Sequence, residues 1–251
     1  MIIFYIFECL IRKKNLFEED YTNNYIEKTN SISEKIQNFI SYSRYLEDFI
    51  LYCIFYDVEN GFYIDINADS DNPTNYSDTK AFYLKGWYGL NIVNFKNKMS
   101  NFLKYRKRDI NIQMDVRSEE DNTTFHFTKN SKLNKNNLNQ NNKSFLYHNT
   151  IKNIFIKYIP KHEEIQFCKI NIKKEEINVL LEYDFENFRP KLFLIKFKNF
   201  FYINLCDKIL LKNNYSLVYQ NKMNRFYIDI RIKYLRQKFI EAKKYLNISI
   251  K

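Results

Sequence analysis

The chain has 251 residues, 45% of them hydrophobic and 18% aromatic, which is enough to bury one substantial core and argues against a disordered protein. Its formal net charge of +11 would suit an anionic partner, but the densest basic run, KYRKR at 104–108, is short. We expect a basic, solvated surface and no specific nucleic-acid partner; charge and aromatic content alone keep nucleic-acid binding as a rival class.

The first eleven residues are apolar but are interrupted by Glu8 and followed by three basic residues. This run is too short to span a membrane and lacks the features of a signal peptide, so no transmembrane segment is expected. The four cysteines are far apart and show no metal-ligand spacing: Cys9, Cys53, Cys168 and Cys206. Buried reduced thiols, no metal and a cytoplasmic location are therefore expected.

Two helical segments are expected at the start of the chain. Residues 1–40 read as a helical lead, in which Ser31 and Glu34 have the spacing of a capping box. A firmer helix should follow and end before Gly61, because apolar residues recur three and four positions apart. These residues are Leu46, Phe49, Ile50, Cys53 and Ile54.

Short apolar runs then alternate with helical patterns as far as residue 230. Strands are expected at 62–66, 90–93, 110–116, 123–128, 165–172, 191–197, 216–220 and 225–230. Helices are expected at 79–85, toward Arg106, and at 151–158, 179–181 and 205–211. This order predicts an α/β domain over residues 41–251 with a mostly parallel sheet and a late antiparallel pair across the turn at 221–224. The Asn- and Lys-rich stretch 129–149 predicts a polar surface loop.

The stretch from Ser43 to Asn94 carries the functional signal. The strand FYIDI contains Asp65 near its end, and small and polar residues and then a helix follow it. In α/β proteins this arrangement places a ligand at the carboxyl edge of the sheet.

This stretch resembles the FkbM family of S-adenosylmethionine-dependent methyltransferases. The family motifs read S-Q-x-G-E-D, V-D-I-G-A-N-D-P and G-W-x-G-I-N-I-E-P, and FCKINIKKEE at 167–176 is similar to a fourth, F-C-K-I-D-I-E-G-A-E. The matching residues are Ser43, Glu47 and Asp48; Asp65, Ile66, Ala68 and Pro73; and Gly86, Trp87, Gly89 and Asn91. The likeness covers about residues 41–230, with the motifs in matching order.

The resemblance implies a Rossmann-like, seven-stranded methyltransferase fold and O-methylation of a sugar or glycan hydroxyl with S-adenosylmethionine. It also implies a set of cofactor-binding residues: Ser43, Glu47, Asp65, Asn67, Ala68, Asp69 and Asn171. Asp65 and Asp69 are the candidate catalytic bases. For Glu47 and Asp48 a solvated helix face is the alternative, for Trp87 packing is favoured, and Gly86 and Gly89 are interpreted as a helix cap and a turn.

Several positions depart from the family pattern. Asn67 replaces a glycine, Val93 replaces the acid that would accept hydrogen bonds from ribose, Asn171 replaces an aspartate and Lys174 replaces a glycine. Each change removes an interaction or adds bulk at the expected site. The alternative hypothesis is therefore a catalytically inactive relative that serves as a binding or structural partner.

Overall fold

The computed structural model describes residues 39–68, 76–93, 96–114, 151–172, 177–197, 200–221 and 223–246. Some expectations lie outside these residues: the helical lead before residue 39, the strand at 123–128, the loop at 129–149, and the roles of Cys9, Asp69 and Lys174.

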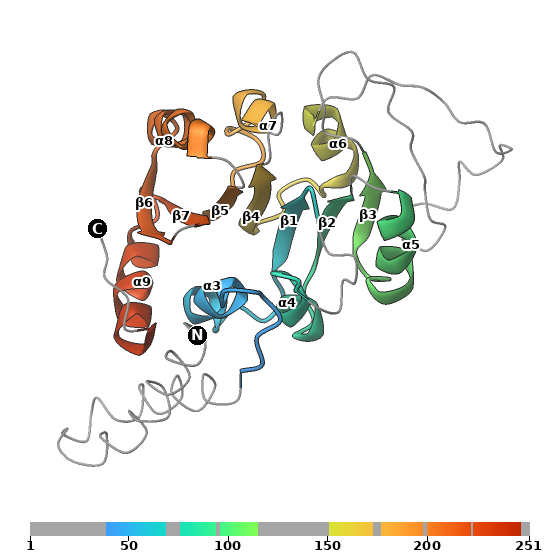
Figure 1. Ribbon diagram of the computed structural model, residues 1–251, viewed down its shortest axis with the longest axis horizontal. Helices are drawn as coiled ribbons and strands as arrows, with labels where there is room; N and C mark the ends of the chain where they lie inside the picture. The colour runs from blue at the N-terminus through green and yellow to red at the C-terminus, as the bar shows by residue number, and fades with distance from the viewer. Residues whose placement is uncertain are drawn as a thin grey trace, which may run out of the picture.

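One seven-stranded mixed sheet forms the centre of the fold, with the strand order β3-β2-β1-β4-β5-β7-β6 (Figure 1). Strands β1 to β5 are parallel, and β7 runs antiparallel to both of its neighbours. The strands are β1 (Phe62–Ile66), β2 (Tyr88–Val93), β3 (Ile110–Gln113), β4 (Ile165–Ile172), β5 (Leu192–Phe197), β6 (Tyr215–Gln220) and β7 (Asn224–Asp229). The predicted mostly parallel sheet with a late antiparallel pair is confirmed.

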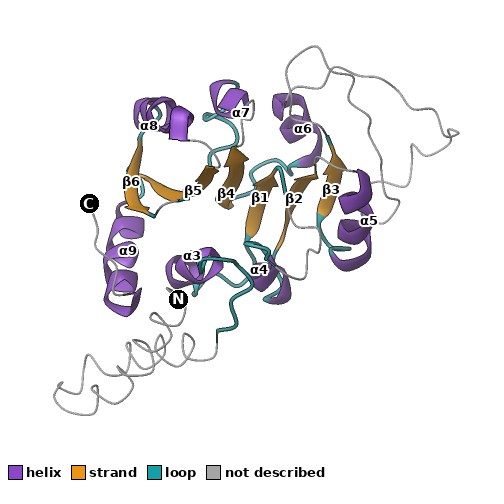
Figure 2. Ribbon diagram, in the orientation of Figure 1, coloured by secondary structure: helices purple, strands orange, loops and turns teal. Residues whose placement is uncertain are grey.

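Helices cover both faces of this sheet (Figure 2). One face carries α3 (Glu47–Phe55), α4 (Lys80–Leu84) and α9 (Lys233–Leu246). The other carries α6 (Ile151–Tyr158), α7 (Ile177–Leu181) and α8 (Ile203–Lys212), which follows a short 3-10 helix, Phe200–Tyr202. Helix α5 (Lys96–Tyr105) packs beside β2 and β3. The sequence patterns predicted each of these helices except α9.

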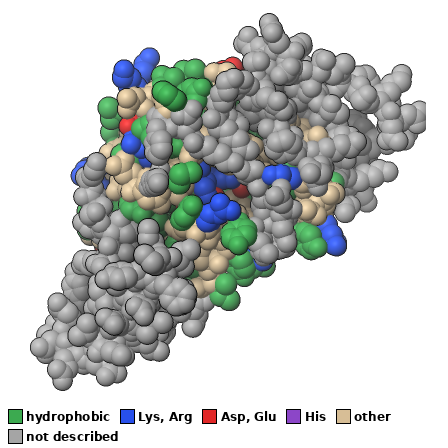
Figure 3. Space-filling view, viewed as in Figure 1, with side chains coloured by type: hydrophobic (Ala, Val, Ile, Leu, Met, Phe, Trp, Pro, Cys, Tyr) green, Lys and Arg blue, Asp and Glu red, His purple; other side chains and the backbone are tan. Residues whose placement is uncertain are grey.

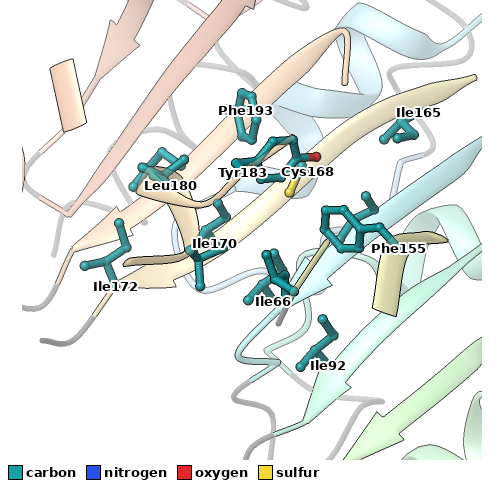
Figure 4. Packing of buried hydrophobic residues seen from close by; sticks show 14 of the residues in the cluster. Ile66, Ile92, Phe155, Ile165, Cys168, Ile170, Ile172, Leu180, Tyr183 and Phe193 are labelled. Carbon is teal, nitrogen blue, oxygen red and sulfur yellow. The ribbon is translucent and has the colours of Figure 1, made fainter. Parts of the chain in front are cut away.

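The central strands are buried on both faces because each alternate residue packs against a different helix layer. Phe62 and Ile64 of β1 join the core under α6 and α7, whereas Tyr63 between them joins the core under α3 and α4. In β4, Cys168 lies close to Tyr183 and Phe193 (Figure 4). Every residue of β1 and β4 is therefore buried, including the polar residues Asp65 and Lys169.

Trp87 has a packing role, as predicted. It is fully buried against Phe82, and its Nε1 donates a 3.2 Å hydrogen bond to the carbonyl of Val58. Gly86 follows the end of α4 with φ 104°, a conformation that suits glycine at a helix end. The turn predicted at Gly89 is wrong, because this residue lies inside β2, where a Cβ would come within 2.3 Å of the Tyr63 ring.

The two glycines give a matched test of this packing. Gly89→Ala is expected to destabilise the protein by about 3 kcal/mol or more, because both the Tyr63 ring and its carbonyl oxygen must move. Gly86→Ala meets no atom within 4 Å and bears only the cost of its positive φ, about 1–2 kcal/mol. Urea unfolding measures both losses. Equal losses, or a smaller one at Gly89, would contradict the packing described for β2.

Candidate functional site

Buried polar side chains gather at the carboxyl half of the sheet, on the face covered by α3 and α4. Alternation along the strands points one set of them to this face, and the segments that cover the sheet contribute the others. We call this group the polar layer: Asp65, Lys169, Asn171, Lys196 and Asn224 from the strands, and Ser43, Glu47, Asp48 and Asp78 from the covering segments. Most of these side chains are almost fully buried; Ser43 is partly buried and Lys196 is 20% exposed.

The polar layer begins at the switch point of the sheet. The chain continues from β1 to β2 on one side and from β4 to β5 on the other, so the carboxyl ends of β1 and β4 border a natural ligand position. Asp65 and Lys169 are register partners there, and the lysine Nζ lies 2.8 Å from Asp65 Oδ1. Burial raises the pKa of Asp65, and the charge of Lys169 opposes that rise.

Lys196 joins the strands to the covering segments. Its Nζ lies 2.8 Å from Glu47 Oε1 and 2.9 Å from Asp78 Oδ2. Burial alone would lower the pKa of Lys196, but the charges of Asp78 and Glu47 outweigh it and raise the pKa. The pKa of Asp78 is lowered because Lys196 and Lys169 together outweigh its burial. Lys196 is therefore held as a cation.

Hydrogen bonds fix the carboxylates that surround Lys196. Ser43 donates to Asp78 Oδ1 at 2.8 Å, and Asn224 Nδ2 donates to Glu47 Oε1 at 2.9 Å. The backbone N–H of Tyr45 donates to Glu47 Oε2. The interpretation of Glu47 and Asp48 as a solvated helix face is wrong, because both side chains are fully buried.

The start of α3 combines a strained backbone conformation with a buried carboxylate. Leu46, the residue before the helix, has φ 63°, a left-handed conformation that is costly for a leucine. Asp48 accepts hydrogen bonds from Ser41 Oγ and the Tyr42 N–H, both at 2.6 Å. Burial raises the pKa of Asp48 to about 6, although these hydrogen bonds oppose the rise.

The turn after β1 keeps a glycine-like backbone without glycine. Asn67 has φ 56°, and its Nδ2 donates a 3.0 Å hydrogen bond to the carbonyl of Asn171 on β4. The N–H of Ala68 donates to Ile92 of β2. Val93 is fully buried and packs with Ala68 and neighbouring apolar residues of α5. Because Val93 belongs to the core, the described end of β2 offers no carboxylate to a ligand.

The structure therefore brings together the predicted candidates Ser43, Glu47, Asp65, Asn67, Ala68 and Asn171 at one edge of the sheet. Sequence reasoning missed Lys169, Lys196, Asp78 and Asn224. The two lysines had a recognisable signal: each interrupts an apolar strand, in FCKI and LIKF, and a lysine inside such a strand requires a buried partner.

A separate buried cluster around Arg106 is relevant to the hypothesis that the chain binds nucleic acid. Arg106, in the middle of the basic run at 104–108, is 1% exposed and donates hydrogen bonds to Tyr63 and Ser77. Asp109 accepts a hydrogen bond from Tyr63, and its pKa is raised to about 6 by burial. Part of this run is therefore structural. On the face in Figure 3, Lys and Arg side chains are more frequent than Asp and Glu.

A cavity of about 270 Å³ adjoins the polar layer. It lies between the end of β5, the start of α8 and the β6–β7 hairpin. Asn224 borders the cavity, but its side chain is fully buried and contacts Glu47 in the polar layer. The lining residues are Phe197, Ile203, Gln220, Asn221, Met223, Asn224 and Arg225.

No family model matches the chain, and no curated protein matches it. A functional proposal therefore depends on the arrangement of the polar layer and on the sequence motifs. Within the described segments, no helix has the length and apolar character needed to cross a membrane. Nor do those segments contain a group of three or more His, Cys, Asp or Glu side chains placed to hold a metal ion.

Lys196→Met tests the ion network. The change leaves Glu47 and Asp78 buried without their cation, so a loss of about 3–5 kcal/mol in unfolding free energy is expected. Adding Asp78→Asn should recover part of this loss. Lys191→Met is the control: its partner Glu164 is 72% exposed, so less than about 1 kcal/mol should be lost. Similar losses for Lys196→Met and Lys191→Met would refute a special role for Lys196.

The raised pKa of Asp48 predicts a pH dependence. Because its folded pKa of about 6 exceeds the ordinary 3.8, the folded state binds this proton more tightly, and stability falls as pH rises through that window. Asp48→Asn cannot titrate there. The stability of the parent relative to this variant should fall between about pH 4 and pH 7, by on the order of 3 kcal/mol. The free energy of unfolding of both proteins is measured in urea across this pH range. A difference between parent and variant that is the same at every pH would contradict the raised pKa of Asp48.

Proposed function

We propose that the chain is a divergent S-adenosylmethionine-dependent methyltransferase of the FkbM type, acting on a sugar or glycan hydroxyl. The observation that carries this proposal is the position of the family-matching residues. Ser43 before α3, Glu47 at the start of α3 and Asp65 on β1 contribute to one polar layer. That layer lies at the switch point of a parallel sheet, where α/β proteins bind ligands.

The fold supports the proposal. A seven-stranded, mostly parallel sheet with an antiparallel pair at one end agrees with the Rossmann-like methyltransferase fold that the resemblance implies. Helices on both faces complete the doubly covered arrangement.

Backbone conformation gives independent support. Two non-glycine residues with positive φ, Leu46 and Asn67, occupy positions where the family motifs have glycine. Gly86, which the chain retains, also has positive φ. Such conformations are uncommon for other residues, so the chain keeps the backbone shape that the motifs encode even where the side chain has changed.

The described residues fit the methionine part of the cofactor better than its ribose. The turn at Asn67 and Ala68 would border the methionine portion. The polar layer contains the carboxylates of Glu47, Asp65 and Asp78 beside Lys169 and Lys196. A layer with this excess of carboxylates favours a cationic ligand. At the end of β2, buried Val93 provides no acceptor for ribose.

The proposed chemistry depends on positioning. Bound S-adenosylmethionine supplies an electrophilic methyl group for attack by an acceptor oxygen. Asp65 is engaged by Lys169 at 2.8 Å, so its role in the chain is to fix the β1–β4 edge rather than to accept a proton. Orientation of the acceptor and exclusion of water then provide the rate enhancement.

A catalytically inactive relative is the second candidate. Its specific support is that Lys169 and Lys196 neutralise Asp65 and Glu47 from within the chain, while Val93 has joined the core. In this case the polar layer stabilises the domain and the chain serves as a binding or structural partner.

Calorimetric titration with S-adenosylmethionine separates the two candidates. An active enzyme should bind it with a dissociation constant between micromolar and millimolar, because the described residues offer ribose no charged acceptor. Asn67→Gly keeps the positive φ and removes the side chain from the turn, so it should strengthen binding about tenfold.

Asn67→Ala is the matched control. It loses the same hydrogen bond to Asn171 but retains a Cβ in the turn, so it should bind less tightly than the glycine variant. If neither the parent nor Asn67→Gly binds at millimolar cofactor, the methyltransferase proposal fails and the inactive relative is favoured.

A further inference from the structure

We propose that the protein binds the surface of anionic lipid bilayers through one edge of its sheet, at the β6 end. The exposed side chains there come from the end of α8, the turn after β7 and the start of α9, two helices that both lie at this end of the sheet (Figure 1). We call this surface the basic edge: Leu211, Lys212, Ile230, Arg231, Lys233 and Tyr234. The inference is independent of the proposed function.

Hydrogen bonds hold the two segments of the basic edge together. The N–H of Ile230 donates to the carbonyl of Asn214 at 3.0 Å, which joins the turn after β7 to the end of α8. Arg189 adds a second connection, because it donates to the carbonyl of Asn213 at 2.6 Å and to Asp229 Oδ2 at 2.5 Å. The exposed side chains are therefore attached to a backbone that is fixed on both sides.

Positive charge at the basic edge has little local opposition. Residues 211–214 and 230–240 together contain five Lys or Arg and no Asp or Glu. The carboxylate that precedes the second stretch, Asp229, is 1% exposed and accepts hydrogen bonds from Arg189 and Arg231. The exposed lysines of the edge therefore add to a positive field, which attracts a surface of anionic headgroups.

Exposed apolar side chains favour a bilayer over nucleic acid as the anionic partner. Leu211 is 70% exposed, Ile230 is 52% exposed and Tyr234 is 49% exposed. Aliphatic side chains gain little from a phosphate backbone, but at a bilayer they enter the boundary between headgroups and acyl chains. A tyrosine suits the same depth, because its ring is apolar and its hydroxyl remains in water. The mixture of cations and aliphatic groups therefore fits anionic lipid.

The basic edge lies opposite the candidate functional site. The end of β7 pairs with the start of β5, with Ile228 beside Leu192, so this is the amino edge of the parallel strands. The polar layer lies toward their carboxyl ends. A bilayer bound at the basic edge would therefore not cover the carboxyl edge, and lipid binding can be measured separately from cofactor binding.

Sedimentation of the full chain with lipid vesicles tests the proposal. We expect at least about tenfold tighter binding to equimolar phosphatidylcholine and phosphatidylserine than to phosphatidylcholine alone, and release at about 0.5 M salt. Lys212→Gln combined with Lys233→Gln should weaken binding about tenfold or more, because each cation near an anionic surface contributes a factor of about five.

Lys104→Gln combined with Lys107→Gln is the matched control. This pair removes the same charge from two exposed side chains at the end of α5 and just after it, beside β3 at the other end of the sheet (Figure 1). Binding to the anionic vesicles should change by less than about threefold. An equal loss in the two lysine pairs, or equal binding of the parent to both kinds of vesicle, would overturn the proposal.

Leu211→Ser combined with Ile230→Ser tests the apolar contribution, and thermal unfolding checks that all variants are folded. Vesicle binding should weaken at least about fivefold, because both side chains are expected to enter the headgroup boundary. A single-stranded RNA of mixed sequence is the competing probe. Tighter binding to this RNA than to anionic vesicles, unchanged in the serine variant, would overturn the proposal and assign the edge to nucleic acid.

Titration with S-adenosylmethionine distinguishes this inference from the proposed function. Binding to anionic vesicles by a chain that does not bind the cofactor would support the basic edge and refute the methyltransferase. Cofactor binding without vesicle binding would refute the basic edge alone.

Discussion

The ion network around Lys196 is the interaction on which the candidate site depends. One ammonium group on β5 binds Glu47 at the start of α3 and Asp78 before α4, so it connects three separate parts of the chain. Buried carboxylates are costly without such a partner. Lys169 has the same effect on Asp65. The two lysines allow an acidic layer to be buried in a protein whose overall charge is strongly positive.

Strained backbone conformations lie next to buried polar and charged groups in this layer. Leu46 and Asn67 both have left-handed backbones, and they lie next to Glu47 and Ala68, which the resemblance assigns to the cofactor site. Strained conformations persist when the surrounding structure fixes them, and they are concentrated at functional sites. Here the neighbouring hydrogen bonds from Tyr45 to Glu47 and from Asn67 to Asn171 provide that fixation.

Much of the fold followed from hydrophobic periodicity. The bounds predicted for strands β1 and β4 agree with the structure, because each strand is a short run rich in apolar residues. Helix α9 was missed, although its buried residues Leu235, Phe239 and Ala242 recur at three- and four-residue spacing. Gly89 was misread as a turn because a glycine can equally mark a close approach, here to the Tyr63 ring.

The site was predictable in part. The motif residues Ser43, Glu47 and Asp65 converge as their positions suggested, but the cations that neutralise Glu47 and Asp65 come from β5 and β4, more than 100 residues later in the chain. Sequence spacing does not encode such partners; sheet order and strand register do. For the same reason, only the structure brings Asn224 and its unsatisfied oxygen next to Glu47.

The most direct test of the account is a crystal structure of the chain grown with S-adenosylmethionine at millimolar concentration. The account predicts cofactor density at the carboxyl ends of β1 and β4, with its methionine part against the turn at Asn67 and Ala68 and with the Asp65–Lys169 ion pair intact. An empty switch point, or cofactor bound elsewhere, would contradict it.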